Sequence, residues 1–297
     1  MTVRRSDCRT VGQLLVWACV LLAGCGRSKR IVVGSKNFTE SDLLGEIVAQ
    51  QIERRTGLPV ERRFHLGGTF VCHQAITSGK IDVYVEYTGT AYTAVLKFPP
   101  AGDRDSVYRT VVAEYAQRFA LAWGRPFGFD NTFAITVRHR DAARYGLARI
   151  SDLARVASQW KAGFGYEFLE RADGFRGLAD TYGLRLATPP TAMDLGLTYR
   201  ALADGKVDVI AGNSTDGQIQ ALDLTVLEDD RHYFPPYEAA PVMRQAVAQA
   251  HPEVTAALAM LAGRISGAEM RRLNALADIE HRDIAAIARD WLRTSLP

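Results

Sequence analysis

The sequence is poor in lysine and has no marked excess of either charge. Six lysines stand against thirty arginines, and 36 basic residues oppose 33 acidic ones. Removing residues 1–24 would leave 33 basic and 32 acidic residues. Such a balance gives no electrostatic footprint for a nucleic acid partner. The composition, 47% apolar and 23% charged, is that of a globular protein and excludes disorder, collagen and coiled coil.

Cysteine is also scarce, and its positions exclude an internal disulfide in the folded body. Cys8 and Cys19 lie before a predicted cleavage point and Cys25 lies at it, which leaves Cys72 alone. One thiol cannot form an internal disulfide, so the fold must depend on its core. Cys72 lies in an apolar segment, and we expect a small buried side chain there rather than a nucleophile or a metal ligand.

Long hydrophobic runs are missing. The stretch Leu14–Ala23 is shorter than the roughly 20 apolar residues of a membrane span. Basic residues precede it and Leu22-Ala23-Gly24-Cys25 follows, which is the pattern of a secretory signal. The ending resembles the lipobox of bacterial lipoproteins. We expect residues 1–24 to be a lipoprotein signal peptide and Cys25 to carry the lipid that anchors a periplasmic or extracytoplasmic body to the membrane; an ordinary signal peptide is the alternative.

Motifs of catalysis, nucleotide binding and metal binding are absent from the sequence. It contains no Gly-x-Ser-x-Gly elbow, phosphate loop or His-Glu-x-x-His helix. The six histidines show no metal-ligand spacing, and we expect structural roles for His65 and His73. We therefore expect a binding protein that is not an enzyme and uses no metal or cofactor. An enzyme on the same fold, the alternative, would have to rely on Lys36.

The sequence does contain a regular alternation of predicted strands and helices, which indicates an α/β protein with a mostly parallel sheet. Thr39 is expected to begin the first helix, with Asp42 as its capping-box partner. Beyond residues 235–236 only helices are predicted. The predicted strands are Ile31–Val33, Val60–Phe64, Ile81–Val85 and Phe133–Val137, and the last three predicted helices are Glu253–Ala262, Ala268–Ala277 and Arg282–Leu292.

One segment recurs along the chain. Residues 75–83 match residues 201–209 without a gap, each copy being a helix end, a Gly-Lys turn and a buried strand. This repeat indicates two lobes of similar build whose strand ends face a common crevice, the place where open α/β sheets bind ligands. The chain is expected to cross between the lobes near residues 128–131 and 233–236.

Aromatic and basic residues are concentrated at the predicted crevice. Tyr87 follows the first repeat strand, Phe133 begins a strand and Tyr237 follows a Pro-Pro pair. Converging rings hold a methylated ammonium group by cation–π attraction, although each ring taken singly could equally be packing. Lys36, just past the first strand, and Arg171, in the second lobe, are suited to a carboxylate.

Six segments carry a resemblance to a known family: Gly34–Glu40, Leu66–Thr69, Glu86–Thr90, Asp130–Ala134, Ser214–Gly217 and Phe234–Pro241. They resemble the substrate-binding proteins of osmoprotectant ABC transporters, the glycine betaine/choline group related to the OpuAC family. The resemblance implies a two-lobed periplasmic-binding-protein fold (type II-like), with two crossovers and a cleft between lobes that closes by a hinge. We expect residues 25–130 and 234–297 to form lobe 1 and residues 131–233 to form lobe 2.

The resemblance also implies a partner and a set of ligand-binding residues. The protein would deliver a compatible solute to an ABC permease and its ATPase, and we expect a monomer without a nucleic acid partner. The positions that match the family's aromatic cage are Tyr87, Phe133, Tyr237 and, where the family often has Tyr, Asn213. The positions that match its carboxylate-binding groups are Lys36, Thr90 and Arg171.

These residues predict a zwitterionic ligand that carries a quaternary ammonium group. Lys36 and Arg171 favour a carboxylate-bearing betaine over choline, and the ligand is expected to be the partner of Arg171. Asn213 removes one cage wall, and each cation–π contact is worth about 0.5–2 kcal/mol. Glycine betaine is the leading expectation. The alternatives are a bulkier betaine such as proline betaine, carnitine or an ergothioneine-like compound, and a lipoprotein that senses solute for a receptor.

Overall fold

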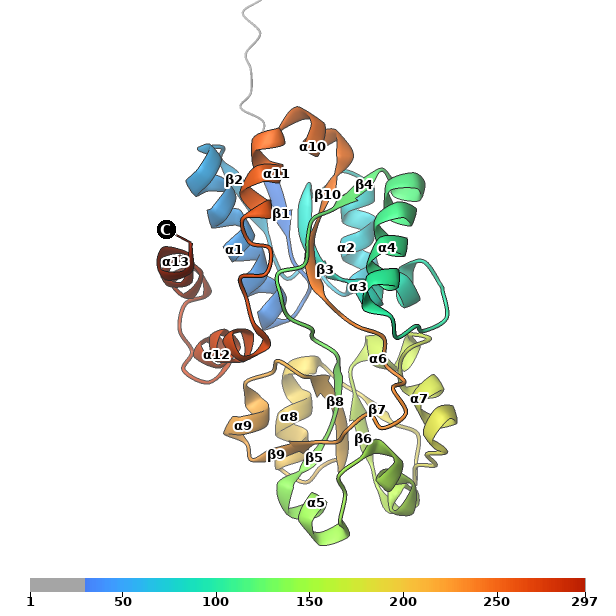
Figure 1. Ribbon diagram of the computed structural model, residues 1–297. Coiled ribbons are helices and arrows are strands. Elements are labelled where there is room, and N and C mark those ends of the chain that lie inside the picture. Colours follow the sequence, from blue (N-terminus) through green and yellow to red (C-terminus); the bar gives the residue numbers. More distant parts are fainter. Residues whose placement is uncertain (1–29, 297) are drawn as a thin grey trace, which may run out of the picture.

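The computed structural model describes residues 30–296, which form two α/β lobes, each with one five-stranded sheet (Figure 1). The predicted signal segment and Cys25 lie outside the described residues. No helix within residues 30–296 is both long and apolar enough to cross a membrane.

The first lobe is built from both ends of the described chain. Its elements are β1 (Ile31–Gly34), α1 (Thr39–Thr56), β2 (Val60–Arg63), α2 (Thr69–Thr77), β3 (Val83–Tyr87), α3 (Thr88–Thr90), the π-helical turn η1 (Ala91–Val95), α4 (Arg104–Phe119), β4 (Leu121–Trp123), β10 (Ala239–Arg244), α10 (Gln245–Ala250), α11 (Pro252–Ala259), α12 (Gly267–Asp278) and α13 (Ile284–Ser295).

The second lobe is continuous in sequence. Its elements are β5 (Phe133–Arg138), α5 (His139–Tyr145), the 3₁₀ turns η2 (Ile150–Arg155) and η3 (Ala157–Gln159), β6 (Ala162–Phe164), α6 (Tyr166–Glu170), α7 (Phe175–Tyr182), β7 (Thr191–Ala192), α8 (Leu195–Ala203), β8 (Val209–Asn213), α9 (Gln218–Ala221) and β9 (Leu224–Val226).

Each sheet has one strand that runs against its neighbours. The strand order is β2-β1-β3-β10-β4 in the first lobe and β7-β6-β8-β5-β9 in the second. β10 is antiparallel to β3 and β4, and β5 is antiparallel to β8 and β9, whereas the other neighbours are parallel. The reversed strands are the two that the chain enters after each crossing, so the predicted mostly parallel sheet is confirmed.

Two local predictions are wrong. The chain beyond residue 236 is not all helical, because Ala239–Arg244 forms β10 in the interior of the first sheet. Its alanines and proline have weak strand propensity, which pairing with β3 and β4 overrides. Asp42 does not cap α1: the N-cap residue is Phe38, which makes no side-chain cap bond, while Asp42 accepts bonds from Ser35 and the His65 N–H.

The repeat found in the sequence is also a repeat of side-chain contacts. The carboxylate of Asp82, just before β3, lies 3.1 Å from the guanidinium of Arg244 at the end of β10. The equivalent carboxylate of Asp208, just before β8, lies 2.7 Å from the guanidinium of Arg138 at the end of β5. In each lobe, therefore, an aspartate–arginine pair links the central strand to the reversed strand.

Two extended segments join the lobes, and they run side by side in opposite directions. The chain crosses between β4 and β5 and returns between β9 and β10 (Figure 1). Asp130 and Glu238 form an antiparallel bridge between these segments, and the Asn131 N–H donates to the Tyr237 carbonyl at 3.0 Å. Paired segments of this kind allow the lobes to rotate about a hinge without separating.

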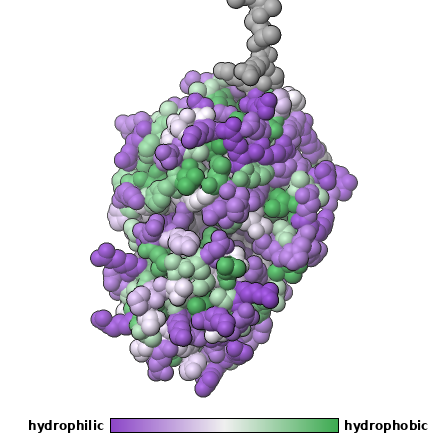
Figure 2. All heavy atoms as spheres, turned by 180° about the vertical axis from the view of Figure 1, so that it is seen from behind, coloured by the Kyte–Doolittle hydropathy of each residue, from purple (hydrophilic) through white to green (hydrophobic). Residues whose placement is uncertain are grey.

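The core of each lobe covers both faces of its sheet. On one face of the first sheet, α1 packs with α11, α12 and α13, and Ile47 and Trp291 are among the buried residues. On the other face, buried Ile76 and Tyr115 belong to the cluster formed by α2, α4 and their strands. Hydrophilic side chains cover most of the outer surface seen in Figure 2, with smaller hydrophobic patches on both lobes.

The two equivalent arginines are expected to differ in their contribution to stability. The Arg138 side chain is 11% exposed and also donates to two backbone carbonyls, whereas Arg244 is 35% exposed. Arg138→Met should lower the free energy of unfolding by about 2–4 kcal/mol, because buried bonds to charged groups are lost. Arg244→Met should cost about 1 kcal/mol or less. Urea denaturation measures both changes, and equal losses would contradict the expectation.

Candidate functional site

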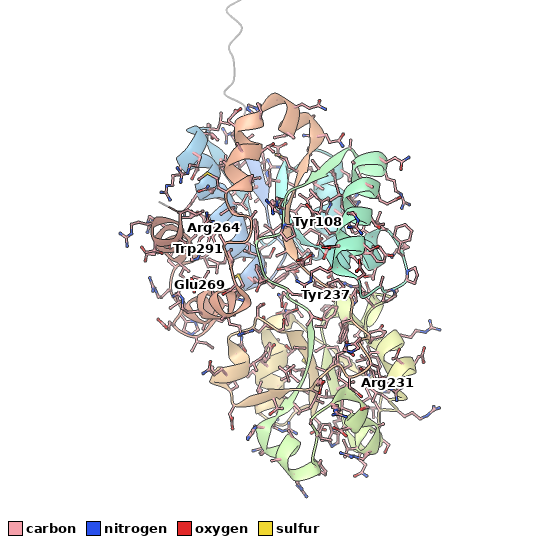
Figure 3. The ribbon with its side chains drawn as sticks, in the orientation of Figure 1. Tyr108, Arg231, Tyr237, Arg264, Glu269 and Trp291 are labelled. Atoms are coloured by element: carbon pink, nitrogen blue, oxygen red, sulfur yellow. The ribbon has the colours of Figure 1, made fainter. Side chains whose placement is uncertain are left out.

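A cavity of about 270 Å³ lies between the lobes. Residues from both lobes line it, and Tyr237, in the returning segment, lies at their junction (Figure 3). The side chains that the sequence predicts as ligand-binding all line this one cavity: Lys36, Tyr87, Thr90, Phe133, Arg171, Asn213 and Tyr237.

These side chains reach the cavity because the elements that carry them end there. Tyr87 is the last residue of β3, Asn213 is the last residue of β8, and Phe133, the first residue of β5, pairs with Asn213 in the second sheet. Arg171 directly follows α6. The cavity is therefore framed by strand ends of both sheets, as the repeat indicated.

Two of the three predicted cage rings are held by buried carboxylates. The Tyr87 hydroxyl donates to Glu40 at 2.7 Å, and the Tyr237 hydroxyl donates to Asp173 at 2.5 Å. Burial raises the pKa of both hydroxyls well above the usual value, so both remain protonated donors. Phe133 has no hydroxyl and packs edge-on against Tyr237, with ring centroids 5.7 Å apart. The orientation of all three rings is thus fixed by neighbouring side chains.

Both cations of the cavity are already paired with buried carboxylates. Lys36 Nζ lies 2.5 Å from Glu86 Oε1 and donates to Thr69 Oγ1 at 3.0 Å. Arg171 forms a bidentate pair with Asp173, with Nε–Oδ1 at 2.8 Å and Nη2–Oδ2 at 2.5 Å. A ligand therefore cannot be the sole partner of Arg171, contrary to the expectation from the sequence, because Asp173 already pairs with it. Asp173 is two residues away in sequence, and nothing in the sequence distinguished it from an ordinary surface acid.

Each paired cation still has donors to offer. Arg171 uses two N–H groups on Asp173 and one on Thr90, whose Oγ1 lies 3.1 Å from Nη1. Because a guanidinium has five N–H donors and an ammonium has three, Arg171 keeps two and Lys36 keeps one beyond the bonds described in residues 30–296. A carboxylate can bind these donors as an addition to two neutral pairs rather than as a counter-ion.

Two carboxylates of the second lobe accept hydrogen bonds from the first lobe across the cleft. Glu167 of α6 accepts bonds from the Thr69 N–H and, at 3.1 Å, from Thr69 Oγ1 at the N-terminus of α2. Gly68 permits this approach, since a Cβ there would collide with the Glu167 carboxylate. Asp173 accepts from Thr93 of the first lobe at 2.6 Å. Glu167 lines the cavity, which consequently carries no excess of positive charge.

Glu40 joins four parts of the chain beside the cage, and the sequence pattern did not single it out. Besides the Tyr87 hydroxyl, its carboxylate accepts from Asn131 at 2.8 Å, Thr215 at 2.5 Å and Asn274 of α12 at 2.8 Å. Burial raises the pKa of Glu40, and these four bonds oppose the rise. An acid in the first turn of a helix is ordinary, so only the tertiary contacts reveal its role.

Two residues expected to be structural, Cys72 and His73, are packed in the described chain, whereas the His65 side chain is 66% exposed and its Nδ1 lies 3.2 Å from Asp42 Oδ2. Cys72 is buried, and burial raises the pKa of its thiol to about 12, which keeps it un-ionised. The His73 ring packs edge-on against Tyr115 and Phe119. Among residues 30–296, no group of three or more His, Cys, Asp or Glu side chains is arranged to hold a metal ion.

Comparison with known proteins identifies relatives over almost the whole described chain. The family model for the substrate binding domain of ABC-type glycine betaine transport systems (OpuAC) matches residues 29–294. The carnitine transport binding protein OpuCC of Listeria monocytogenes is 33% identical over 289 residues, which cover 94% of each chain. The ergothioneine transport permease/ergothioneine binding protein EgtU of Helicobacter pylori is 34% identical over 265 residues, covering 89% of this chain and 47% of that protein.

A solved structure has the same architecture. The crystal structure of a glycine betaine/carnitine/choline ABC transporter protein aligns with a TM-score of 0.73 and 32% sequence identity, covering 89% of this chain and 97% of that one. At this level of similarity the two-lobed fold of the two proteins is shared, as the sequence predicted.

Arg171→Ala is expected to destabilise the protein as well as to abolish ligand binding. The Asp173 side chain is 0% exposed, and an uncompensated buried charge costs about 3–5 kcal/mol. The double variant Arg171→Met/Asp173→Asn removes both charges, and it should recover most of the stability without recovering binding. Urea denaturation and calorimetric titration separate the two effects. Wild-type stability of Arg171→Ala would show that the pair contributes nothing to the fold.

Asp216, which follows β8, has an ionisation that should make stability depend on pH. It accepts from the Tyr199 hydroxyl at 2.6 Å and from the Asn213 N–H at 2.9 Å. Burial, opposed by these bonds, raises its pKa to about 7. The folded state therefore binds a proton that the unfolded state releases near pH 4, and stability from this group falls as pH rises from about 4 to 7.

Asp216→Asn should remove this fall. Relative to the variant, the wild type should lose free energy of unfolding by up to about 1.4 kcal/mol per pH unit between about pH 4 and 7, and nothing further above that. Urea denaturation of both proteins across this range is the measurement. Glu40 and Asp278, whose pKa values burial also raises, contribute in the same direction to both proteins. A wild-type–variant difference that does not change with pH would contradict the assignment.

Proposed function

Because the chain belongs to the family of substrate-binding domains of ABC-type glycine betaine transport systems, we propose that it captures a quaternary-ammonium zwitterion outside the cytoplasm and delivers it to an ABC permease. Members of this family are transporter components and not enzymes. Substrate-binding proteins of ABC importers act outside the cytoplasm, and a lipid on Cys25 would keep this one near its permease. We propose that it acts as a monomer.

The single observation that carries the ligand proposal is the pairing of three fixed rings with spare cationic donors in one small cavity. Tyr87, Phe133 and Tyr237 line the cavity, with Lys36 over the Tyr87 ring and Arg171 over the other two. Aromatic rings also attract a trimethylammonium group, which cannot form hydrogen bonds. The spare N–H groups of Lys36 and Arg171 offer bonds to a carboxylate. The cavity, about 270 Å³, lies below the range of about 300–1,000 Å³ of sites for drug-sized ligands, which favours a small solute.

Glycine betaine is the leading ligand, and the names of the relatives agree with this class. Two relatives, 33% and 34% identical to this chain, are named as binding proteins for carnitine and for ergothioneine. Both compounds are betaines larger than glycine betaine. They are the alternatives among carboxylate-bearing ligands.

A specific observation also favours choline as a second candidate. Lys36 and Arg171 are neutralised by Glu86 and Asp173, so neither cation requires a carboxylate from the ligand. Glu167 adds a further negative charge to the cavity wall, and a ligand with a net positive charge gains from it. The preference for a zwitterion over choline therefore depends on hydrogen bonding by the spare donors and not on net charge.

Calorimetric titration of residues 26–297 with glycine betaine, proline betaine, carnitine, choline and ergothioneine tests the proposal. We expect a carboxylate-bearing betaine to bind most tightly and choline at least about tenfold more weakly, since it leaves the spare donors without an acceptor. Choline binding as tightly as every betaine would favour the second candidate. No heat with any of the five compounds would contradict a quaternary-ammonium site altogether.

A further inference from the structure

The predicted cage is open on the side of Asn213. Tyr87, Phe133 and Tyr237 supply rings, but the fourth position carries an amide, whose Nδ2 lies 3.4 Å from Asp216 Oδ2. The backbone N–H of Asn213 donates to the same oxygen at 2.9 Å. Both groups of Asn213 therefore contact Asp216, which follows the same strand. Asn213 offers no ring face to a cation.

A second cavity, of about 180 Å³, adjoins the first at this open side. Five residues line both cavities and so mark the boundary between them: Asn37, Phe38, Asp194, Leu195 and Asn213. Phe38 is the aromatic member of this set. The ring of Phe38 therefore lies at the boundary of the two cavities. It belongs to the first lobe, whereas Asn213 belongs to β8 of the second.

We infer that Phe38 is the fourth aromatic wall of the cage and a specificity-determining residue for the trimethylammonium group, an inference that rests on the proposed function. Its ring centroid lies 6.3 Å from that of Tyr87, with an angle of 30° between the two planes. The side chain is partly buried and lines the same cavity as the three predicted cage rings. Phe38 and Tyr87 thus form a stacked pair on the first-lobe side of the cavity.

The helix that follows gives no reason for a phenylalanine at this position. Phe38 is the N-cap of α1, with φ −151° and ψ 154°, and makes no side-chain cap bond. Ser, Thr, Asp or Asn at an N-cap would bond a free backbone N–H, which Phe cannot do. The preceding backbone is nevertheless well fixed: the Lys36 N–H donates to Ser41 Oγ at 2.8 Å, and the Asn37 N–H donates to the Gly67 carbonyl at 3.1 Å. Phe38 packs against the core of the first lobe, but it gives the helix no cap bond, and the loop places its ring at the cavity.

Phe38→Leu and Phe38→Tyr separate a ring that contacts the cation from a side chain that only packs. Leucine keeps an apolar side chain but has no π-system, whereas tyrosine keeps the ring. The probes are glycine betaine and 3,3-dimethylbutanoate, in which a neutral carbon replaces the ammonium nitrogen. Where a probe binds too weakly for direct titration, its affinity is measured by competition with glycine betaine. Phe38→Leu should weaken glycine betaine binding about 2- to 30-fold, the range of one cation–π contact, and change 3,3-dimethylbutanoate binding by less than about twofold. Phe38→Tyr should keep both affinities within about twofold.

The effect of Phe38→Leu is also measured in a protein that carries Asn213→Tyr, for comparison with the wild type. A ring at residue 213 would occupy the open side, so Phe38→Leu should cost less glycine betaine affinity in Asn213→Tyr than in the wild type. Thermal unfolding of each variant shows whether it is folded at the titration temperature.

The outcomes separate this inference from the proposed function. If Phe38→Leu leaves glycine betaine binding unchanged, or weakens both probes equally, Phe38 only packs and the inference is overturned while the proposed function stands. An equal loss with Phe38→Tyr, or an undiminished cost in the Asn213→Tyr background, overturns it as well. A wild type that binds no trimethylammonium compound of the panel overturns the proposed function and this inference together.

Discussion

The buried carboxylate of Glu40 is the contact on which the arrangement of the site depends. A carboxylate removed from water is costly unless hydrogen bonds replace its hydration. Glu40 obtains these bonds from a ring of the cage, a crossing segment, the second lobe and α12. Each donor is held in place by the need to satisfy the same anion. The position of Tyr87 is consequently coupled to the hinge and to the C-terminal helices, which lie far from it in sequence.

The charged groups of the cavity follow the same rule. Lys36 and Arg171 are buried and line the cavity, and each is neutralised by an acid, so the cavity wall carries no large unpaired charge from them. The proposed zwitterion suits such a site because its carboxylate can accept hydrogen bonds from the spare N–H groups of Lys36 and Arg171. The proposed specificity then depends on the positions of a few N–H groups and aromatic rings. The ring faces attract a cation without forming strong hydrogen bonds, so they do not bind water tightly.

The sequence predicted the parts of the site that lie at strand ends and missed those defined by contacts between distant segments. Periodicity and the repeat located β3 and β8 and, with β3, Tyr87, whereas the family resemblance indicated Asn213 at the end of β8. By contrast, β10 has weak strand propensity, and its existence depends on pairing with strands more than a hundred residues earlier. Acidic residues are common at positions such as those of Glu40, Glu86 and Asp173, and these three form no sequence motif. Their roles arise only when the fold buries them beside Tyr87, Lys36 and Arg171, and no local pattern encodes that burial.

The division of the proposed binding residues between the lobes has a consequence for the order of ligand contacts. Lys36, Tyr87 and Thr90 all belong to the first lobe, whereas Phe133 and Arg171 belong to the second. In the proposed site, a solute would meet Tyr87 and Lys36 on the first lobe while the cleft is open. The remaining contacts would form when the second lobe rotates onto the solute. Encounter is then governed by the surface of one lobe and residence time by both, so the rates of capture and release can be altered separately by substitutions on opposite sides of the hinge.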